Sequence, residues 1–199
     1  HLAQRTHELE WSRDTPLSLA TELPGSDVDG RVAIALALGR LRNTEAIALL
    51  AGLRSDPEER VRVAAARALA WTPGSAPAIH EWLATLQAPN TVYERAQAQH
   101  GETVALLGAL GHQGEAADIA FLRDTLRQPW PIGGAAARAL GKMWIRKVEG
   151  VRDAVPDLCS RLEATDPRMV ADVAWALSRI GLEGVGPADL KRVVRRLSS

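Results

Sequence analysis

The sequence predicts an all-α protein that folds as a right-handed α-solenoid of about five helix pairs. The stretch Asp56–Trp71, DPEERVRVAAARALAW, is rich in alanine and arginine, and alanine is the strongest helix former and lets a neighbouring helix approach closely. A short Ala-Leu-Gly signal also recurs along the chain. No run of alternating β-branched residues predicts a strand.

The recurring signal marks the ends of five alanine-rich helices. Its leucines are 30 to 41 residues apart, a spacing typical of helix-turn-helix units joined by loops of variable length. One such unit cannot bury its apolar face alone, so stacking has to supply the core. The five signals are Ala37-Leu38-Gly39, Ala68-Leu69-Ala70, Ala109-Leu110-Gly111, Ala139-Leu140-Gly141 and Ala176-Leu177-Ser178.

A more amphipathic helix follows each signal. In the third of them, Ile119, Leu122 and Leu126 have the i, i+3, i+7 spacing of a helix with one buried face. The long loop at 88–97 predicts an extra turn or a bend in the third unit. We expect the amphipathic helices at Thr44–Leu53, Ala76–Leu86, Glu115–Leu126, Val151–Leu162 and Pro187–Leu197.

Asp-Pro pairs predict two helix starts. Asp56 and Asp166 each precede a proline, so we expect an N-cap aspartate followed by proline at the first helical position. Glu59 follows Asp56 by three residues, which is the spacing of a capping box. We expect a single repeat domain over 1–199, with an N-terminal extension or first helix at 1–15 and a terminal capping helix at 187–199.

The stretch DPEERVRVAAARALA and its linked amphipathic helices resemble HEAT-like repeats of the bacterial type that phycobilisome bilin lyases share. The resemblance covers about Pro16–Leu197 and concerns architecture far more than activity. It implies stacked helix pairs whose alanines touch neighbouring pairs. We therefore expect Ala65 and Ala136 to be buried and intolerant of larger side chains.

Composition limits the partners and the chemistry of a site. Lys and Arg together number 24, as do Asp and Glu, so no global charge draws the protein to nucleic acid or a membrane. Cys159 is the single cysteine, and we expect a buried, unreactive thiol. No apolar run reaches the roughly 18 residues of a membrane span. We expect a soluble protein, with the cytoplasm favoured and a removed signal segment compatible with the start at His1.

Aligning the five alanine-rich helices gives two columns of basic and aromatic residues. One column is the position after each glycine-like residue, and the other lies four residues earlier, on the same helical face. Arg and Trp are the residues that most often anchor interfaces. The resulting hypothetical concave binding surface, called the ladder below, consists of Arg40, Arg67, Trp71, Arg138, Lys142, Trp175 and Arg179.

A purely structural interpretation of these residues stays open. The arginines would then pair with acids or cap helix C-termini, and Trp71 and Trp175 would be half-buried packing residues. The same choice applies to Trp130 in QPWPIGG, which would be either an exposed contact knob or a plug in its inter-helix loop.

No catalytic constellation is visible in the sequence. HEAT-like DNA glycosylases that remove alkylated bases use a basic face with aromatic and acidic groups, which Trp175 and Asp172 would imitate, although we expect Asp172 to cap a helix or face solvent. Deoxyhypusine hydroxylase, another relative, holds a di-iron centre with four His-Glu pairs, and only His7-Glu8 and His80-Glu81 occur here. We therefore expect no metal site and no cofactor. His80, His100 and His112 are expected to be isolated and either solvated or capping.

The sequence therefore predicts a non-catalytic scaffold or adaptor, monomeric alone, that binds a protein or acidic peptide through the ladder. One alternative is a DNA-binding or alkylbase glycosylase-like repair protein. Others are a prosthetic-group lyase or assembly factor, and an accessory repeat region of a larger multidomain protein. Nucleic acid is disfavoured because every neutralised phosphate needs a Lys or Arg and the charges here balance.

Overall fold

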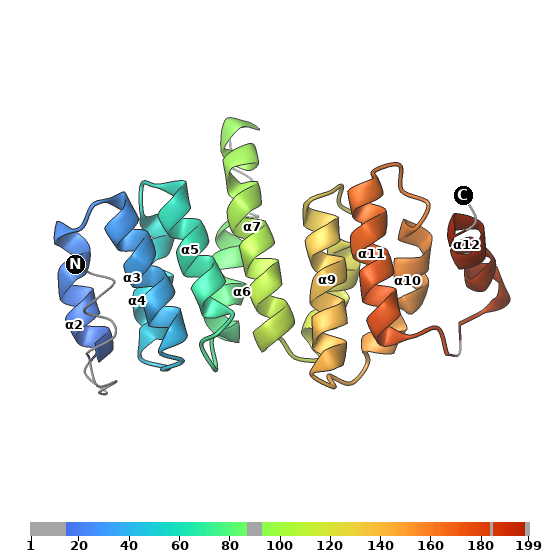
Figure 1. Cartoon of the computed structure of the whole chain (residues 1–199), viewed down its shortest axis with the longest axis horizontal. Coiled ribbons are helices and arrows are strands. Elements are labelled where there is room, and N and C mark those ends of the chain that lie inside the picture. Colours follow the sequence, from blue (N-terminus) through green and yellow to red (C-terminus); the bar gives the residue numbers. More distant parts are fainter. Residues whose placement is uncertain (1–14, 87–92, 184, 198–199) are drawn as a thin grey trace.

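Helices in two layers make up the described chain (Figure 1). The computed structural model describes residues 15–86, 93–183 and 185–197, and these contain eleven α-helices, three short 3-10 helices and no strand. The alanine-rich helices, which form the front layer, are α3 (Val28–Arg40), α5 (Glu59–Leu69), α7 (Tyr93–Gln113), α9 (Ile132–Ile145) and α11 (Pro167–Ile180). The back layer consists of α4 (Ala46–Gly52), α6 (Ala76–Leu86), α8 (Asp118–Thr125) and α10 (Val155–Arg161).

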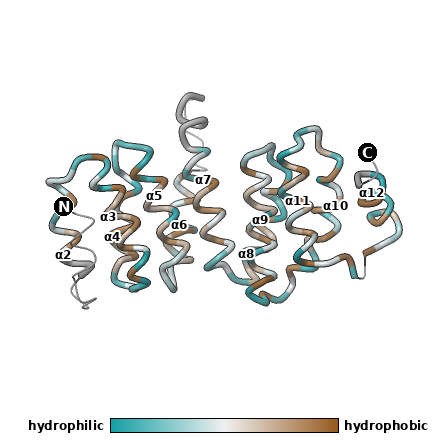
Figure 2. The backbone as a smooth tube through the Cα atoms, in the orientation of Figure 1, coloured by the Kyte–Doolittle hydropathy of each residue, from teal (hydrophilic) through white to brown (hydrophobic). Residues whose placement is uncertain are grey.

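The helices follow one another in chain order along the stack. Each front-layer helix from α3 to α11 packs against the next one, and α5, α7, α9 and α11 each pack on the preceding back-layer helix. α2 (Thr15–Glu22) and α12 (Pro187–Leu197) lie at opposite ends, where α2 packs on α3 and α12 on α10. Hydrophilic residues gather at the turns at both ends of the helices (Figure 2). The predicted all-α solenoid of helix pairs is confirmed.

Small residues permit the close approach of successive front-layer helices. A Cβ atom built on Gly39 would lie 2.8 Å from the Cα and the carbonyl oxygen of Ala68, and one built on Gly111 would lie 2.9 Å from the Cα of Ala139. Backbone atoms cannot move aside as a flexible side chain can, so glycine is required at these two positions. The Ala-Leu-Gly signals thus mark places where one helix touches the next. Ala65 and Ala136 are completely buried, as predicted.

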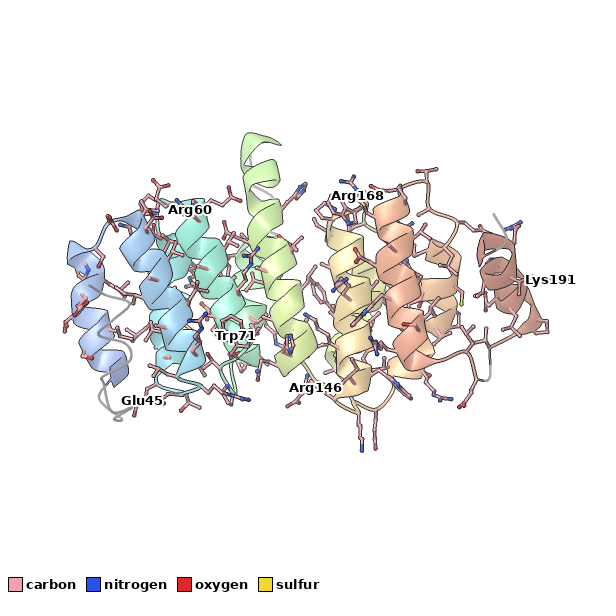
Figure 3. The ribbon with its side chains drawn as sticks, in the orientation of Figure 1. Glu45, Arg60, Trp71, Arg146, Arg168 and Lys191 are labelled. Atoms are coloured by element: carbon pink, nitrogen blue, oxygen red, sulfur yellow. The ribbon has the colours of Figure 1, made fainter. Side chains whose placement is uncertain are left out.

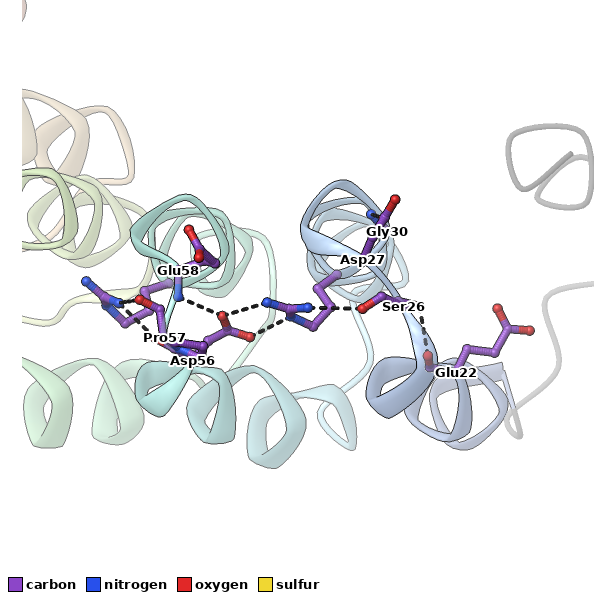
Figure 4. Close-up of polar contacts among 9 residues, drawn as sticks. Glu22, Ser26, Asp27, Gly30, Asp56, Pro57 and Glu58 are labelled. Carbon is purple, nitrogen blue, oxygen red and sulfur yellow. Dashed lines mark hydrogen bonds and ion pairs between the residues drawn. The ribbon is translucent and has the colours of Figure 1, made fainter.

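One of the two predicted helix starts is confirmed and the other is wrong. Asp166 is the N-cap of α11, where its side chain accepts from the amide of Arg168 at 2.9 Å and Pro167 opens the helix. Asp56 does not cap α5, which begins at Glu59, so the capping box is absent. Its carboxylate accepts instead from the Glu58 amide at 2.9 Å and from Arg31 at 2.8 and 3.1 Å (Figure 4). Because the Asp56 carboxylate binds the guanidinium of Arg31 on α3, it is directed toward α3 and does not cap α5.

Three predicted back-layer helices are shorter in the structure. α8 begins three residues late because the side chain of Asp118 accepts from the Glu115 amide and closes a turn before the helix. The segment predicted at Val151–Leu162 divides into the 3-10 helix η3 (Val151–Ala154) and α10, since Pro156 lacks an N–H and is tolerated only in the first turn of an α-helix. The segment predicted at Thr44–Leu53 is α4, and η2 (Leu53–Ser55) follows it.

The third unit departs from the others in the predicted region. α7 has 21 residues against 14 in α9 and α11, and it starts at Tyr93 within the predicted loop. Its first turns project beyond the neighbouring helices (Figure 1). The C-terminal end of α7 lies at about the same level as the C-terminal ends of the other front-layer helices (Figure 1). The extra length is therefore added at the N-terminal end of α7.

Candidate functional site

Ion pairs connect the front-layer helices near their N-terminal ends. Arg60 of α5 pairs with Asp29 of α3, and Arg62 of α5 pairs with Glu102 of α7. The buried Glu102 also accepts a hydrogen bond from the indole of Trp82 at 3.2 Å. Arg31 pairs with Asp56, which precedes α5, and Arg138 pairs with Asp172 near the middle of α9 and α11. Arg168 pairs with Asp166 within the start of α11 itself.

The C-terminal halves of the same helices carry cations without carboxylate partners. No acidic residue occurs in Ala35–Arg40, Ala65–Leu69, Val104–Gln113, Ala139–Ile145 or Ala174–Ile180. Basic residues there form no ion pair with any residue that the structure describes. These unpaired residues are Arg40, Arg67, Lys142 and Arg179, followed by Arg42, Arg146 and Lys147 just beyond helix ends.

A cavity of about 590 Å³ opens where the front-layer helices end. Its lining residues lie at or just after the C-termini of four neighbouring front-layer helices, α3, α5, α7 and α9. Trp71 and Arg146 lie toward the same end of this layer in Figure 3. The residues that line the cavity are Arg40, Arg42, Ala70, Trp71, His112, Gln113 and Arg146.

Two side chains tie the walls of this cavity together. Gln113 Nε2 donates to the Ala70 carbonyl at 2.8 Å and joins the end of α7 to the end of α5. Arg146 Nη1 donates to the Gly114 carbonyl at 2.9 Å and joins α9 to α7. Arg40 and Arg42, in contrast, have no hydrogen bond from their side chains to any described residue. Their guanidinium groups are therefore available to a ligand.

The second half of the ladder is organised around one indole. The guanidinium carbon of Arg138 lies 4.9 Å from the centroid of the Trp175 ring, and that of Arg179 lies 5.6 Å from it. Arg138 also pairs with Asp172 at 3.2 Å. The cation–π contacts orient both arginines, but only Arg179 has no carboxylate partner among the described residues and is open to an incoming anion.

Burial and neighbouring cations lower the pKa of two basic residues in this region. Burial lowers the pKa of His112, and the nearby Lys142 and Arg146 lower it further. Burial also lowers the pKa of Lys142, with a further contribution from Arg138. Both shifts arise because a positive charge is costly beside other cations and away from water. A bound anion would oppose them.

The structure places the seven ladder residues on one layer, in two groups. Arg40 and Trp71 line the cavity, while Arg138, Trp175 and Arg179 form the stacked group. Lys142 lies between them, where its Cδ packs over Gly111. Arg67 is exposed in the last turn of α5. Trp71 is 40% exposed and Trp175 is half-buried, so the packing interpretation suits Trp175 better.

Sequence reasoning missed three residues of the cavity. Arg42, Gln113 and Arg146 do not occupy the aligned columns, and two of them follow the ends of their helices. The sequence signal that could have found Arg42 and Arg146 is the presence of basic residues just after the ends of α3 and α9. Arg42 and Lys147 both adopt positive φ, at 52° and 64°, a conformation that usually belongs to glycine.

Other candidate residues have structural partners. Trp130 is half-buried beneath Arg168, whose guanidinium carbon lies 3.7 Å from the ring centroid, so it is a plug and not an exposed knob. Asp172 neither caps a helix nor faces solvent, because it pairs with Arg138. His80 is not isolated, since its Nε2 lies 2.6 Å from Asp118. Cys159 is buried, and burial raises the pKa of its thiol. His7 and Glu8 lie outside the described residues.

The described residues contain neither a cluster of metal ligands nor a membrane-spanning helix. Within 15–86, 93–183 and 185–197, no three His, Cys, Asp or Glu side chains are grouped as a metal site would require. None of the helices described there has the length and apolar character needed to cross a bilayer.

Comparison with known families identifies the repeats. Residues 17–101 match the family of HEAT repeats. The match covers α2 to the middle of α7, and the same alternation of front-layer and back-layer helices continues beyond it to α11. No curated protein matches the chain.

Proposed function

We propose that this HEAT-like repeat protein is a non-catalytic interaction scaffold whose ladder captures an acidic segment of a protein partner. HEAT repeats are commonly protein-interaction scaffolds. The ladder runs from the middle to the C-terminal ends of α3, α5, α9 and α11, with Trp71 just beyond the end of α5. An extended segment lying across these helices would meet a basic or aromatic side chain at each of them.

The contrast between paired and unpaired cations carries this proposal. Arginines near the N-terminal ends are neutralised across helices, as in Arg60 with Asp29 and Arg62 with Glu102. Arginines that serve only to hold neighbouring helices together are expected to form such ion pairs. Arg40, Arg67 and Arg179 have exposed side chains and no carboxylate partner in the described chain. An acidic partner would supply the missing negative charges.

Favourable interaction with the helix termini is the competing explanation. Cations near a helix C-terminus gain typically 0.3–1 kcal/mol from the helix dipole. Arg146 fits that explanation because it donates to carbonyls at the end of α7. Arg67 also lies in the last turn of α5 but makes no hydrogen bond to a described carbonyl, so a favourable helix-end position leaves all its guanidinium donors free for a partner. The exposed indole of Trp71 gains nothing from a helix dipole.

An acidic protein segment fits the ladder better than duplex DNA. DNA binding requires many cations along a phosphate backbone, whereas the whole chain has a formal net charge of zero. The ladder combines a small number of cations with indole rings. Such a combination suits a peptide that has both carboxylates and apolar side chains.

Charge reversal tests the proposal. The double variant Arg67→Glu/Arg179→Glu is compared with Arg127→Glu/Lys191→Glu, which changes net charge equally at the end of α8 and on α12. Binding of a fluorescein-labelled peptide rich in Asp and Glu is measured by anisotropy, and partners are captured from cells of the source organism. We expect at least tenfold weaker peptide binding, and loss of the captured partners, only in the ladder variant.

Two outcomes would contradict this function. Equal binding by the ladder variant and the control variant would remove the ladder as the contact surface. Tight, salt-dependent binding to duplex DNA, with no binding to the acidic peptide, would favour the nucleic-acid alternative. Arg138 is left unchanged in these variants because reversing it would place a second carboxylate beside the half-buried Asp172, whereas the Asp124 partner of Arg127 in the control is largely exposed.

A further inference from the structure

The cavity at the ends of α3, α5, α7 and α9 has an unusual lining. Its charged groups are the guanidiniums of Arg40, Arg42 and Arg146, with the imidazole of His112 beside them. No carboxylate lines it. Three permanent positive charges without an internal counter-charge give this cavity a positive potential that attracts an anion from solution or from a ligand.

From this lining we infer that the cavity is a binding site for a phosphate monoester carried on a planar or apolar stem, with the phosphate held by Arg40, Arg42 and Arg146 and the stem against Trp71. The inference rests on the proposed function in one respect: within that function, the natural source is a phosphorylated residue of the captured acidic segment. A free small phosphate ester shares the same chemistry.

Charge balance favours phosphate over carboxylate. A single carboxylate would neutralise one of the three guanidiniums, whereas a phosphate monoester carries about −1.5 to −2 charges at neutral pH and three acceptor oxygens. Arginine forks bind such oxygens in a bidentate manner. Arg146 donates from Nη1 to the Gly114 carbonyl at 2.9 Å and to the Gly111 carbonyl at 3.4 Å, which fixes its position, while Arg40 and Arg42 have all their donors free within the described chain.

Size and the indole favour an ester over the bare ion. The cavity has a volume of about 590 Å³, within the range of about 300–1,000 Å³ that ligand sites occupy. An inorganic phosphate would leave most of that space to water. Trp71 lines the cavity and is 40% exposed, so its ring can stack on a planar group next to the phosphate.

Two matched variants separate the charge of the cavity from the fold. Arg42 and Lys147 both follow a front-layer helix, both have positive φ and both are exposed. Glycine adopts this backbone without strain, so Arg42→Gly and Lys147→Gly remove one charge each without disturbing the helix ends. Only Arg42 lines the cavity, since Lys147 lies in a different depression beside Trp144.

The experiment measures the affinities of phenyl phosphate and benzoate for the wild-type chain and for both glycine variants by titration calorimetry. Phenyl phosphate has the phosphate and the planar stem, and benzoate is a monoanion of similar size. We expect phenyl phosphate to bind at least tenfold more tightly than benzoate, with this preference lost in Arg42→Gly and kept in Lys147→Gly. Equal affinities for the two probes, or equal loss in both variants, would overturn the inference.

A phosphotyrosine-containing acidic peptide and its unphosphorylated twin identify the source of the ester. Much tighter binding of the phosphopeptide than of phenyl phosphate assigns the site to a protein partner, and similar binding assigns it to a free small ester; both results support the site. Failure of the scaffold function is distinguishable, because then phenyl phosphate binds in an Arg42-dependent manner while peptide binding is unaffected by Arg67→Glu/Arg179→Glu.

Discussion

Trp175 packs directly on Gly141, so that a Cβ atom added to this glycine would lie 2.6 Å from Cζ3 of the indole. The same ring carries Arg138 and Arg179 at 4.9 and 5.6 Å from its centroid. The helix contact between α9 and α11 and the orientation of two ladder arginines therefore depend on one small residue. This relationship connects the packing of the repeats to the proposed binding surface.

We predict that Gly141→Ala destabilises the protein by about 1–3 kcal/mol, because the added methyl group either displaces the indole or separates α9 from α11. The free energy of unfolding is measured by denaturation in urea. Gly108→Ala is the matched control, since Gly108 is also inside a front-layer helix but has open space around it. Alanine there is expected to stabilise by up to about 1 kcal/mol through helix propensity. Similar effects of the two substitutions would contradict the packing argument.

A second prediction concerns the buried carboxylate of α7. Glu102→Leu removes the partner of Arg62 and of the Trp82 indole, whose contacts are 2.7 and 3.2 Å. The half-buried Arg62 guanidinium then keeps only the Asp56 and Pro57 carbonyls as partners, and the loss of its counter-ion is expected to cost about 1–3 kcal/mol. Glu81→Leu is the control, because the Arg54–Glu81 pair is exposed and such pairs contribute about 0–1 kcal/mol. Denaturation of both variants checks this, and a loss below about 1 kcal/mol for Glu102→Leu would show that Arg62 finds other partners.

The regular part of the fold was predictable from the sequence because it depends on repetition. The Ala-Leu-Gly signals predicted the front-layer helices. The structure shows why the residues of these signals are small: Gly39 and Gly111 touch the backbone of the next helix. The ends of helices were less predictable. Asp56 forms a long-range ion pair with Arg31 instead of a local cap, and a single sequence does not indicate which of two such partners prevails.

The candidate site was predictable only where it follows the register of the repeats. Arg40 and Trp71 occupy equivalent positions and were found by alignment. Arg42 and Arg146 follow helix ends, where the register no longer applies. Pairing between Arg138 and Asp172 depends on the offset between α9 and α11, which helical periodicity within one segment does not determine. For this reason paired and unpaired arginines could be distinguished only in three dimensions.

Acid is expected to remove the contribution of Asp56 to stability. Burial alone would raise the pKa of this carboxyl, but hydrogen bonds from Arg31 and the Glu58 amide outweigh burial and leave the pKa lowered. The carboxylate form is thus preferred in the folded state, and its contribution is complete above the ordinary carboxyl pKa of about 3.9. This contribution disappears as the pH falls through the lower, folded-state value.

The measurement compares the wild-type chain with Asp56→Asn across this pH range. We expect a constant difference in the free energy of unfolding above about pH 5, which shrinks as acid protonates Asp56 in the wild-type protein. Asp29→Asn is a control because Asp29 and its partner Arg60 are both largely exposed, so a smaller difference is expected at every pH. A wild-type advantage over Asp56→Asn that persists unchanged into strong acid would refute the ion-pair explanation.

Proton uptake at His112 should accompany ligand binding in the cavity. Burial and the cations Lys142 and Arg146 lower the pKa of this imidazole, and Arg40 and Arg42 also line the cavity. A bound phosphate monoester adds negative charge and raises the pKa again. Binding therefore strengthens as the pH falls through the interval between the lowered pKa of the free protein and the higher pKa of the complex.

The comparison of the wild-type chain with His112→Gln isolates this effect. Phenyl phosphate itself gains a proton near pH 6, and this weakens its binding to both proteins equally. The ratio of the two dissociation constants cancels the titration of the probe. We expect that ratio to favour the wild-type chain increasingly as the pH is lowered from about 8 toward the free-state pKa of His112 and to level off below it. A ratio that does not change with pH would mean that His112 does not sense the bound anion, and that the ligand lies elsewhere in the cavity.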